Sequence, residues 1–111
     1  MFIMKKLIEV AICYDFDGTL AAGNMQEYGF LKKLNISPKE FWDKSDAMAA
    51  QFNADNNLCY LKCMLEAVKA KKQAFRREDF IACGKDITFF EGVETWFERI
   101  NAYALSKGIV L

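Results

Sequence analysis

The sequence contains no histidine, and it has a single proline, Pro38. Without histidine, the chain cannot build a histidine general base, a histidine-ligated haem site or a mixed Cys/His zinc site. Lys plus Arg and Asp plus Glu number 15 each, so no global charge attracts nucleic acid or a membrane surface. No apolar run approaches the roughly 18 residues of a membrane span. These absences favour a protein that binds neither nucleic acid nor membranes.

Cysteines are few, and their pattern does not indicate a disulfide framework. There are four, at positions 13, 59, 63 and 83. Cys59 and Cys63 are four residues apart, which places them on one face of a helix, and we expect them to pack there rather than to bind metal. Residues 1–13 lack the small-residue cleavage site of a signal peptide. Together these features predict a cytoplasmic protein.

The most informative stretch is a near-continuous apolar run, Leu7 to Tyr14, interrupted only by Glu9. Such a run is typical of a strand buried on both faces of a parallel sheet. It stops abruptly at Asp15 and Asp17. Residues two apart in an extended chain point to the same side, so both carboxylates should leave the strand end together.

Paired carboxylates need a partner, because each raises the pKa of the other and burial adds to the cost. A bound cation is the simplest remedy. Gly18 permits a sharp turn close to a ligand, and Thr19 adds a hydroxyl and a backbone N–H. Ligands of open α/β sheets bind just beyond the carboxyl ends of the strands, where these residues are expected. The sequence therefore predicts a cation and phosphate site at Asp15, Asp17, Gly18 and Thr19.

The stretch Asp15-Phe16-Asp17-Gly18-Thr19-Leu20 resembles the first motif of the haloacid dehalogenase-like (HAD) hydrolases. That motif reads DxDGT followed by Leu or Val, and it comes after an apolar strand. The resemblance implies that Asp15 is a nucleophile that forms an aspartyl-phosphate, and that Asp17 is the general acid and then the base. It also implies magnesium held by the Asp15 carboxylate and the Asp17 backbone carbonyl.

The residue types suit that chemistry. A carboxylate can attack phosphorus and split one difficult step into two. A divalent cation must then offset the repulsion between the acids and the phosphoryl group, and magnesium takes oxygen ligands of this kind. The implied function is magnesium-dependent hydrolysis of a small phosphorylated metabolite, with phosphotransfer as a close variant.

Other interpretations of the Asp-x-Asp-Gly pattern remain open. A calcium loop of the EF-hand kind needs an acid or Asn, Gly and Glu where this chain has Thr19, Leu20 and Gln26. A plain strand-to-turn junction is a second possibility. The alternative function is a non-catalytic module that binds magnesium or phosphate, or that docks a partner.

The rest of the chain is predicted to be mostly helical within an α/β fold. Apolar spacing and capping signals predict helices over residues 25–34, 38–52, 56–73 and 93–106, and a second strand at 109–111. A further short helix is predicted to begin at Arg76 or Arg77, to run through Cys83 and to be closed by Gly84. In the third of these helices, we expect Leu58, Leu61, Leu65 and Val68 to form the buried stripe. The resemblance implies a partial HAD-like Rossmannoid core at 1–21 and 89–111, with a helical cap at 22–88 inserted after the first strand.

In the HAD family, the next strand ends in a Ser or Thr that binds phosphate, and a Lys and further acids follow later. None of these can be placed before Leu111. We therefore expect the chain to be the N-terminal portion of a HAD-like phosphatase, incomplete as a catalyst by itself. Completing the core is expected to need the missing C-terminal half or self-association.

Overall fold

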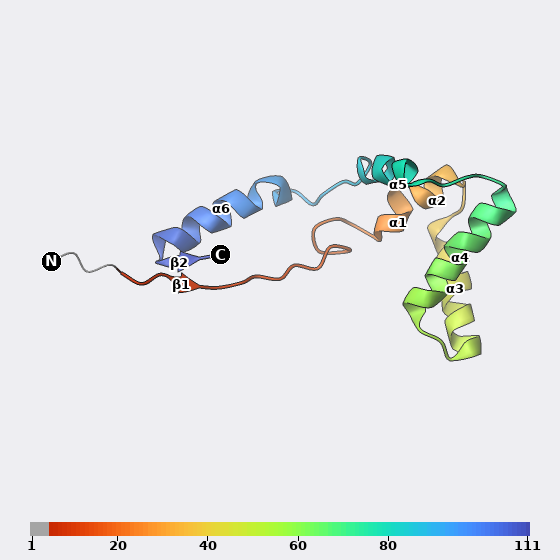
Figure 1. Ribbon diagram of the computed structural model, residues 1–111, viewed down its shortest axis with the longest axis horizontal. Coiled ribbons are helices and arrows are strands. Elements are labelled where there is room, and N and C mark those ends of the chain that lie inside the picture. Colours follow the sequence, from red (N-terminus) through yellow and green to blue (C-terminus); the bar gives the residue numbers. More distant parts are fainter. Residues whose placement is uncertain (1–4) are drawn as a thin grey trace. The chain divides into compact units, whose positions relative to one another are not determined.

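The computed structural model describes residues 5–111 (Figure 1). The chain divides into two compact units, one formed by residues 24–87 and one by the described part of 1–23 together with 88–111. The elements of the described residues are, in order, β1 (Ile8–Glu9), α1 (Met25–Tyr28), α2 (Phe30–Lys33), α3 (Pro38–Phe52), α4 (Asn56–Lys71), α5 (Arg77–Gly84), α6 (Val93–Ser106) and β2 (Ile109–Val110). The fold is thus mostly helical with a small parallel sheet, which agrees with the predicted mixture of helices and strands.

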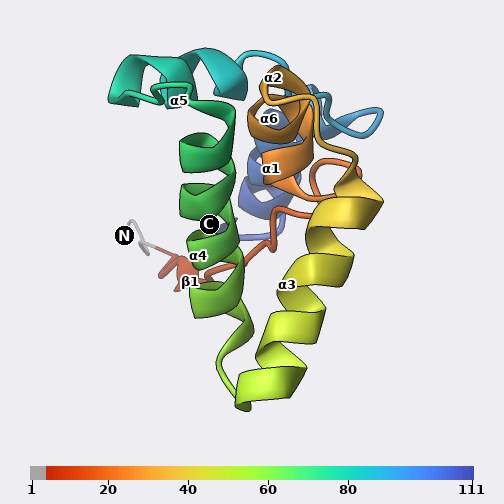
Figure 2. The same ribbon diagram turned by 90° about the vertical axis from the view of Figure 1, so that its right-hand side faces the viewer.

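Residues 24–87 form an all-helical unit, α1 to α5. The predicted helix over 25–34 is interrupted at Gly29, which separates α1 from α2. Helix α3 begins as the sequence predicts, with Pro38 in its first turn and the Ser37 hydroxyl accepting the Glu40 N–H at 3.1 Å. Helices α3 and α4 then pack side by side (Figure 2).

The core of the helical unit brings α2, α3 and α4 together. Its buried members are Phe30, Leu31, Leu34, Phe41 and Cys63. The Lys44 ammonium of α3 donates to Glu66 of α4 at 3.0 Å, and this hydrogen bond lowers the pKa of Glu66 and raises that of Lys44. The core therefore joins three helices, and an ion pair links two of them outside it.

The stripe predicted for α4 is wrong at its three leucines, whereas Val68 is half-buried and packs against the core. Leu58, Leu61 and Leu65 are 67%, 48% and 65% exposed, whereas Cys59 and Cys63 are 4% and 1% exposed. The helix has apolar residues on two faces, and the face that carries the cysteines is the one that packs. The expectation that Cys59 and Cys63 serve packing is confirmed.

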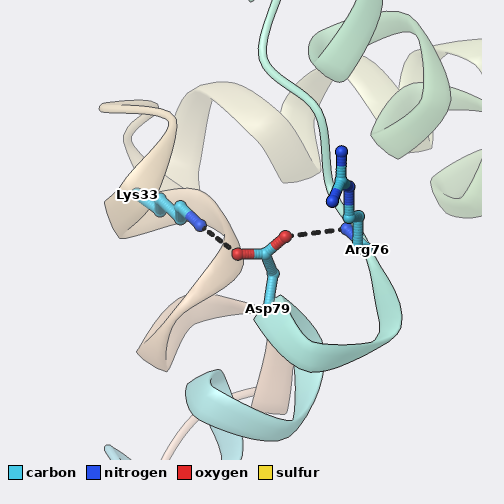
Figure 3. A network of polar contacts seen from close by, with 3 residues as sticks. All are labelled: Lys33, Arg76 and Asp79. Atoms are coloured by element: carbon cyan, nitrogen blue, oxygen red, sulfur yellow. Dashed lines mark hydrogen bonds and ion pairs between the residues drawn. The ribbon is translucent and has the colours of Figure 1, made fainter.

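Helix α5 is tied to α2 through one carboxylate, that of Asp79 (Figure 3). One oxygen accepts from the Lys33 ammonium at 2.7 Å, and the other accepts from the Arg76 backbone N–H at 2.8 Å. Asp79 thereby satisfies an N–H that the first turn of a helix leaves without an intrahelical partner. The Lys33 hydrogen bond, together with that of Arg76, lowers the pKa of Asp79.

The second unit holds the two strands and α6. Strands β1 and β2 are parallel, with Ile8 opposite Ile109 and Glu9 opposite Val110. Flanking hydrogen bonds join the Ile8 N–H to the Gly108 carbonyl at 3.0 Å and the Val10 N–H to the Val110 carbonyl at 2.9 Å. The predicted bounds of the α6 helix are confirmed.

The predicted long strand, buried on both faces, is wrong. The pairing covers two residues in each strand, and Leu7, Ile8, Val10 and Ile12 are 43–63% exposed. A sheet of two short strands cannot cover both faces of an extended segment, so these side chains keep contact with solvent. In this unit, the buried side chains among the described residues are those of Ala21 and Ala104.

Among residues 5–111, no helix is both long enough and apolar enough to cross a bilayer.

Candidate metal and phosphoryl site

The predicted site lies on a tight turn between residues 16 and 21. The Phe16 carbonyl accepts the N–H groups of Thr19, Leu20 and Ala21 at 3.2, 2.9 and 3.2 Å. The Gly18 N–H donates to the Ala21 carbonyl at 2.8 Å. Four backbone hydrogen bonds within six residues therefore fix this turn.

Gly18 is needed for the turn. Its φ is +75°, in the left-handed region that glycine adopts without steric cost. A Cβ at this residue would meet no atom within 4 Å, so the requirement concerns the backbone conformation and not space. The prediction of a sharp turn at Gly18 is confirmed.

The turn is hydrogen-bonded to residues 89 and 90, which follow the helical unit in the sequence. Ala21 forms a parallel bridge to Asp17 and an antiparallel bridge to Phe89, and the Phe90 N–H donates to the Leu20 carbonyl at 3.0 Å. Ala21 is 1% exposed. The segment that carries the two acids is thus held from both sides by backbone hydrogen bonds.

Asp15 and Asp17 occupy different surroundings. Asp15 is exposed, and its Oδ1 accepts the Phe16 backbone N–H at 2.9 Å. Asp17 is half-buried and takes part in the bridge to Ala21. Neither acid lies on a helix, and the chain before Asp15 is extended, so the helix that precedes an EF-hand calcium loop is absent from this described stretch.

Aromatic residues hold the backbone on each side of Asp15. The Trp96 Nε1–H of α6 donates to the Tyr14 hydroxyl at 2.8 Å, and the Tyr14 ring meets Phe97 edge-on at 5.4 Å between centroids. The Phe16 ring meets Phe89 edge-on at 6.1 Å. Asp15 is the exposed residue between two anchored ones.

The side chain and the backbone N–H of Thr19 have different surroundings. The residue is exposed, while its N–H donates to the Phe16 carbonyl. The N–H groups of Gly18 and Thr19 are both used inside the turn. A phosphate bound here would meet the Thr19 hydroxyl in preference to these two N–H groups.

The oxygen atoms of Asp15 and Asp17 are the type of ligand that magnesium prefers. Magnesium in phosphoryl-transfer sites is held by one or two carboxylates, with phosphate and water completing the shell. Asp15 and Asp17 supply two carboxylates within three residues. Among residues 5–111, no group of three or more His, Cys, Asp or Glu side chains is placed to hold a metal ion.

The anchoring residues were missed by sequence reasoning. Trp96 and Tyr14 are 82 positions apart, and each fits an amphipathic or apolar pattern that carries no sign of the other. The alternation of Tyr14 and Phe16 with the acids was the available signal, since it places aromatic and acidic residues on opposite sides of an extended chain. Comparison of the chain with protein-family models, curated proteins and solved structures gives no match.

Proposed function

We propose that the chain is part of a HAD-like phosphatase and that Asp15 is the nucleophile that accepts a phosphoryl group from a phosphomonoester. In this proposal the unit with β1, β2 and α6 belongs to the catalytic core, and residues 24–87 are the cap. The observation that carries the proposal is the placement of Asp15, an exposed carboxylate between the anchored residues Tyr14 and Phe16, directly before the Gly18 turn.

The anchoring has a chemical purpose in this proposal. Nucleophilic attack requires the reacting atoms to be held in a narrow range of positions, and fixing the backbone beside the nucleophile supplies part of that order. Tyr14 is held by Trp96, and Phe16 by Phe89 and by three hydrogen bonds to its carbonyl. The carboxylate of Asp15 itself stays open to solvent and to a substrate.

The reaction has two steps. First, an Asp15 carboxylate oxygen forms a bond to phosphorus, the ester P–O bond breaks, and Asp17 gives its proton to the leaving alcohol oxygen. Second, Asp17 takes a proton from water as the water oxygen bonds to phosphorus. The bond between Asp15 and phosphorus then breaks, and inorganic phosphate leaves.

The residues that would hold magnesium are Asp15, through its carboxylate, and Asp17, through its backbone carbonyl. When bound, the ion offsets the repulsion between these acids and the phosphoryl oxygens. The two acids flank Phe16, whose carbonyl accepts three N–H groups of the Gly18 turn, so a single ion could contact both.

The experiment is a phosphoryl-capture assay. The chain is incubated with p-nitrophenyl phosphate and magnesium, and intact mass and peptide mapping follow the modification of Asp15. We expect one hydroxylamine-sensitive phosphoryl group per chain, lost with EDTA and in Asp15→Asn. Asp46→Asn, a matched change at an exposed residue of α3, should keep the modification. Equal modification of the Asp15→Asn variant would show that the nucleophile is wrongly assigned.

A second candidate is a module that binds magnesium and phosphate without covalent chemistry. The small donor set favours it, since two acids without a third described ligand bind a cation weakly. This candidate predicts magnesium-dependent binding of inorganic phosphate by calorimetry, abolished in Asp15→Asn, and no modified Asp15. The two assays together separate the candidates.

A further inference from the structure

The helical unit contains a cavity, and Asp15 and Asp17 are not among its lining residues. Its volume is about 310 Å³, and it is bounded by side chains of α1, α2, α4 and α5. The wall is predominantly apolar and is formed in part by Gln26, Phe30, Tyr60, Met64, Phe80 and Cys83. All of these residues belong to 24–87, so the cavity is complete within one unit.

One polar group at this cavity is unsatisfied. Gln26 borders the cavity, and its amide oxygen Oε1 is buried with no hydrogen-bond partner among residues 5–111. A buried acceptor without a partner is unfavourable, because folding has removed its hydrogen bonds to water without replacing them. The final side-chain torsion of glutamine has a broad energy minimum, so a donor bound in the cavity could reorient the amide to meet it.

The remaining wall suits an aromatic ring. The Phe30 and Phe80 rings are nearly parallel, with an interplanar angle of 6° and centroids 6.0 Å apart. Met64 and Cys83 add sulfur atoms, which make favourable contacts with aromatic rings. The cavity opens to solvent on one side, where the lining residues Met25, Leu61 and Phe80 are exposed, so a ligand can enter without unfolding the unit.

We propose that this cavity binds a small planar aromatic molecule that carries one hydrogen-bond donor, and that Gln26 Oε1 accepts that donor. The volume of the cavity indicates the size of the ligand. An apolar cavity of about 150 Å³ holds benzene, so the cavity of about 310 Å³ accommodates a bicyclic ring system. The volume also lies at the lower end of the range of small-molecule sites. The inference does not rest on the proposed phosphatase chemistry.

The test uses the full chain and two probes of nearly equal shape, indole and benzofuran. Indole donates through its N–H, whereas benzofuran has a ring oxygen in the same position and no donor. Binding is followed by amide chemical shifts in a ¹H–¹⁵N titration. We expect saturable binding of indole with shifts centred on Phe30, Met64 and Cys83, and about tenfold weaker binding of benzofuran.

Two glutamine variants isolate the acceptor. Gln26→Leu keeps the size of the side chain and removes the oxygen, so indole and benzofuran should bind it equally well. Gln51→Leu, the same change at an exposed residue of α3, should keep the preference for indole. Gln26→Met serves as a second variant if Gln26→Leu does not fold.

Several outcomes overturn the inference. These are the absence of saturable indole binding, shifts centred away from the cavity, and a preference for indole that survives in both Gln26 variants. Concentration-dependent dimerisation that produces the same shifts would also overturn it, since a second copy would then fill the cavity. None of these outcomes depends on phosphorylation of Asp15.

Discussion

Gly29 and Cys83 are in such close contact that no side chain fits between them. A Cβ built on Gly29 would lie 2.3 Å from the Cys83 Cβ and 2.8 Å from its Cα. Gly29 separates α1 from α2, and Cys83 belongs to α5. The absence of a side chain at residue 29 is what lets α5 approach the junction of the two short helices.

Gly29→Ala is therefore expected to destabilise the helical unit. The backbone atom of Cys83 cannot move aside as a flexible side chain could, so α5 must shift, at a cost of about 1–3 kcal/mol. Thermal and urea unfolding by circular dichroism measure this loss. The matched control is Gly84→Ala in α5, where an added Cβ meets nothing within 4 Å.

Gly84→Ala should be neutral or slightly stabilising, because alanine has the higher helix propensity. Equal losses in the two variants would show that glycine flexibility, and not the contact with Cys83, determines the effect. A larger loss at residue 84 would contradict the packing described for this junction.

The Asp79 carboxylate predicts a dependence of stability on pH (Figure 3). The hydrogen bond from Lys33, and that from Arg76, lower its pKa in the folded chain. The folded state therefore binds fewer protons than the unfolded state near the ordinary pKa of Asp, about 3.9. The contribution of Asp79 to stability is present above that value and is lost as the pH falls through the lower, folded-state pKa.

Asp79→Asn should lower the stability at neutral pH and weaken its decline as the pH falls below about 4. Urea unfolding at a series of pH values measures both effects. Asp86→Asn provides the control, since Asp86 is an exposed acid just beyond α5. If Asp79→Asn and wild type lose stability in parallel on acidification, the contacts with Lys33 and Arg76 do not act through the charge of Asp79.

The sequence predicts local features of this fold better than contacts between distant residues. The start of α3 depends on Ser37, Pro38 and Glu40, which are adjacent, and it was predicted correctly. The helical segment was expected to span residues 22–88, and the helical unit of the structure spans residues 24–87. The identity of the two units as catalytic core and cap stays a prediction.

The apolar pattern of the sequence does not predict which residues distant in the sequence pack together. Helix α4 has a leucine face and a cysteine face, and the spacing alone favours the leucines. The face that packs is decided by the small and aromatic residues of α3, among them Phe41, Ser45 and Ala49, which are buried. The length of β1 depends in the same way on its partner β2, and the anchoring of Tyr14 depends on Trp96.

Thiol alkylation tests the burial of the cysteine face. Cys13 is exposed, whereas Cys59 and Cys63 are buried. Burial raises the pKa of the Cys63 thiol, so less of the reactive thiolate is present near pH 8. Iodoacetamide should modify Cys13 first, and Cys63 at least about tenfold more slowly, as read by peptide mass spectrometry.

Denaturant supplies the control for this measurement. In urea all four thiols should react at similar rates, because the protection comes from folded structure and not from local sequence. Rapid alkylation of Cys63 in the native chain would place the leucine face, rather than the cysteine face, in the core of the helical unit.

The contact between Tyr14 and Trp96 predicts coupling between α6 and the segment that carries Asp15. Tyr14→Phe and Trp96→Phe each remove the 2.8 Å hydrogen bond, so their effects on the free energy of unfolding should not add. The double-mutant cycle should give a coupling of about 1 kcal/mol. Tyr103→Phe, at an exposed position of α6, should show no coupling to Tyr14→Phe.

The same variants connect the anchoring to the proposed chemistry. If Trp96 helps to hold Asp15 through Tyr14, Trp96→Phe should slow the phosphorylation of Asp15 more than Tyr103→Phe does, measured at a temperature where both variants are fully folded. Tyr14→Phe should slow it to a similar extent, and the double variant should be no slower than either alone. Unchanged phosphorylation in Trp96→Phe, with the expected loss of stability, would limit the hydrogen bond to a structural role and leave the position of Asp15 to the turn at Gly18.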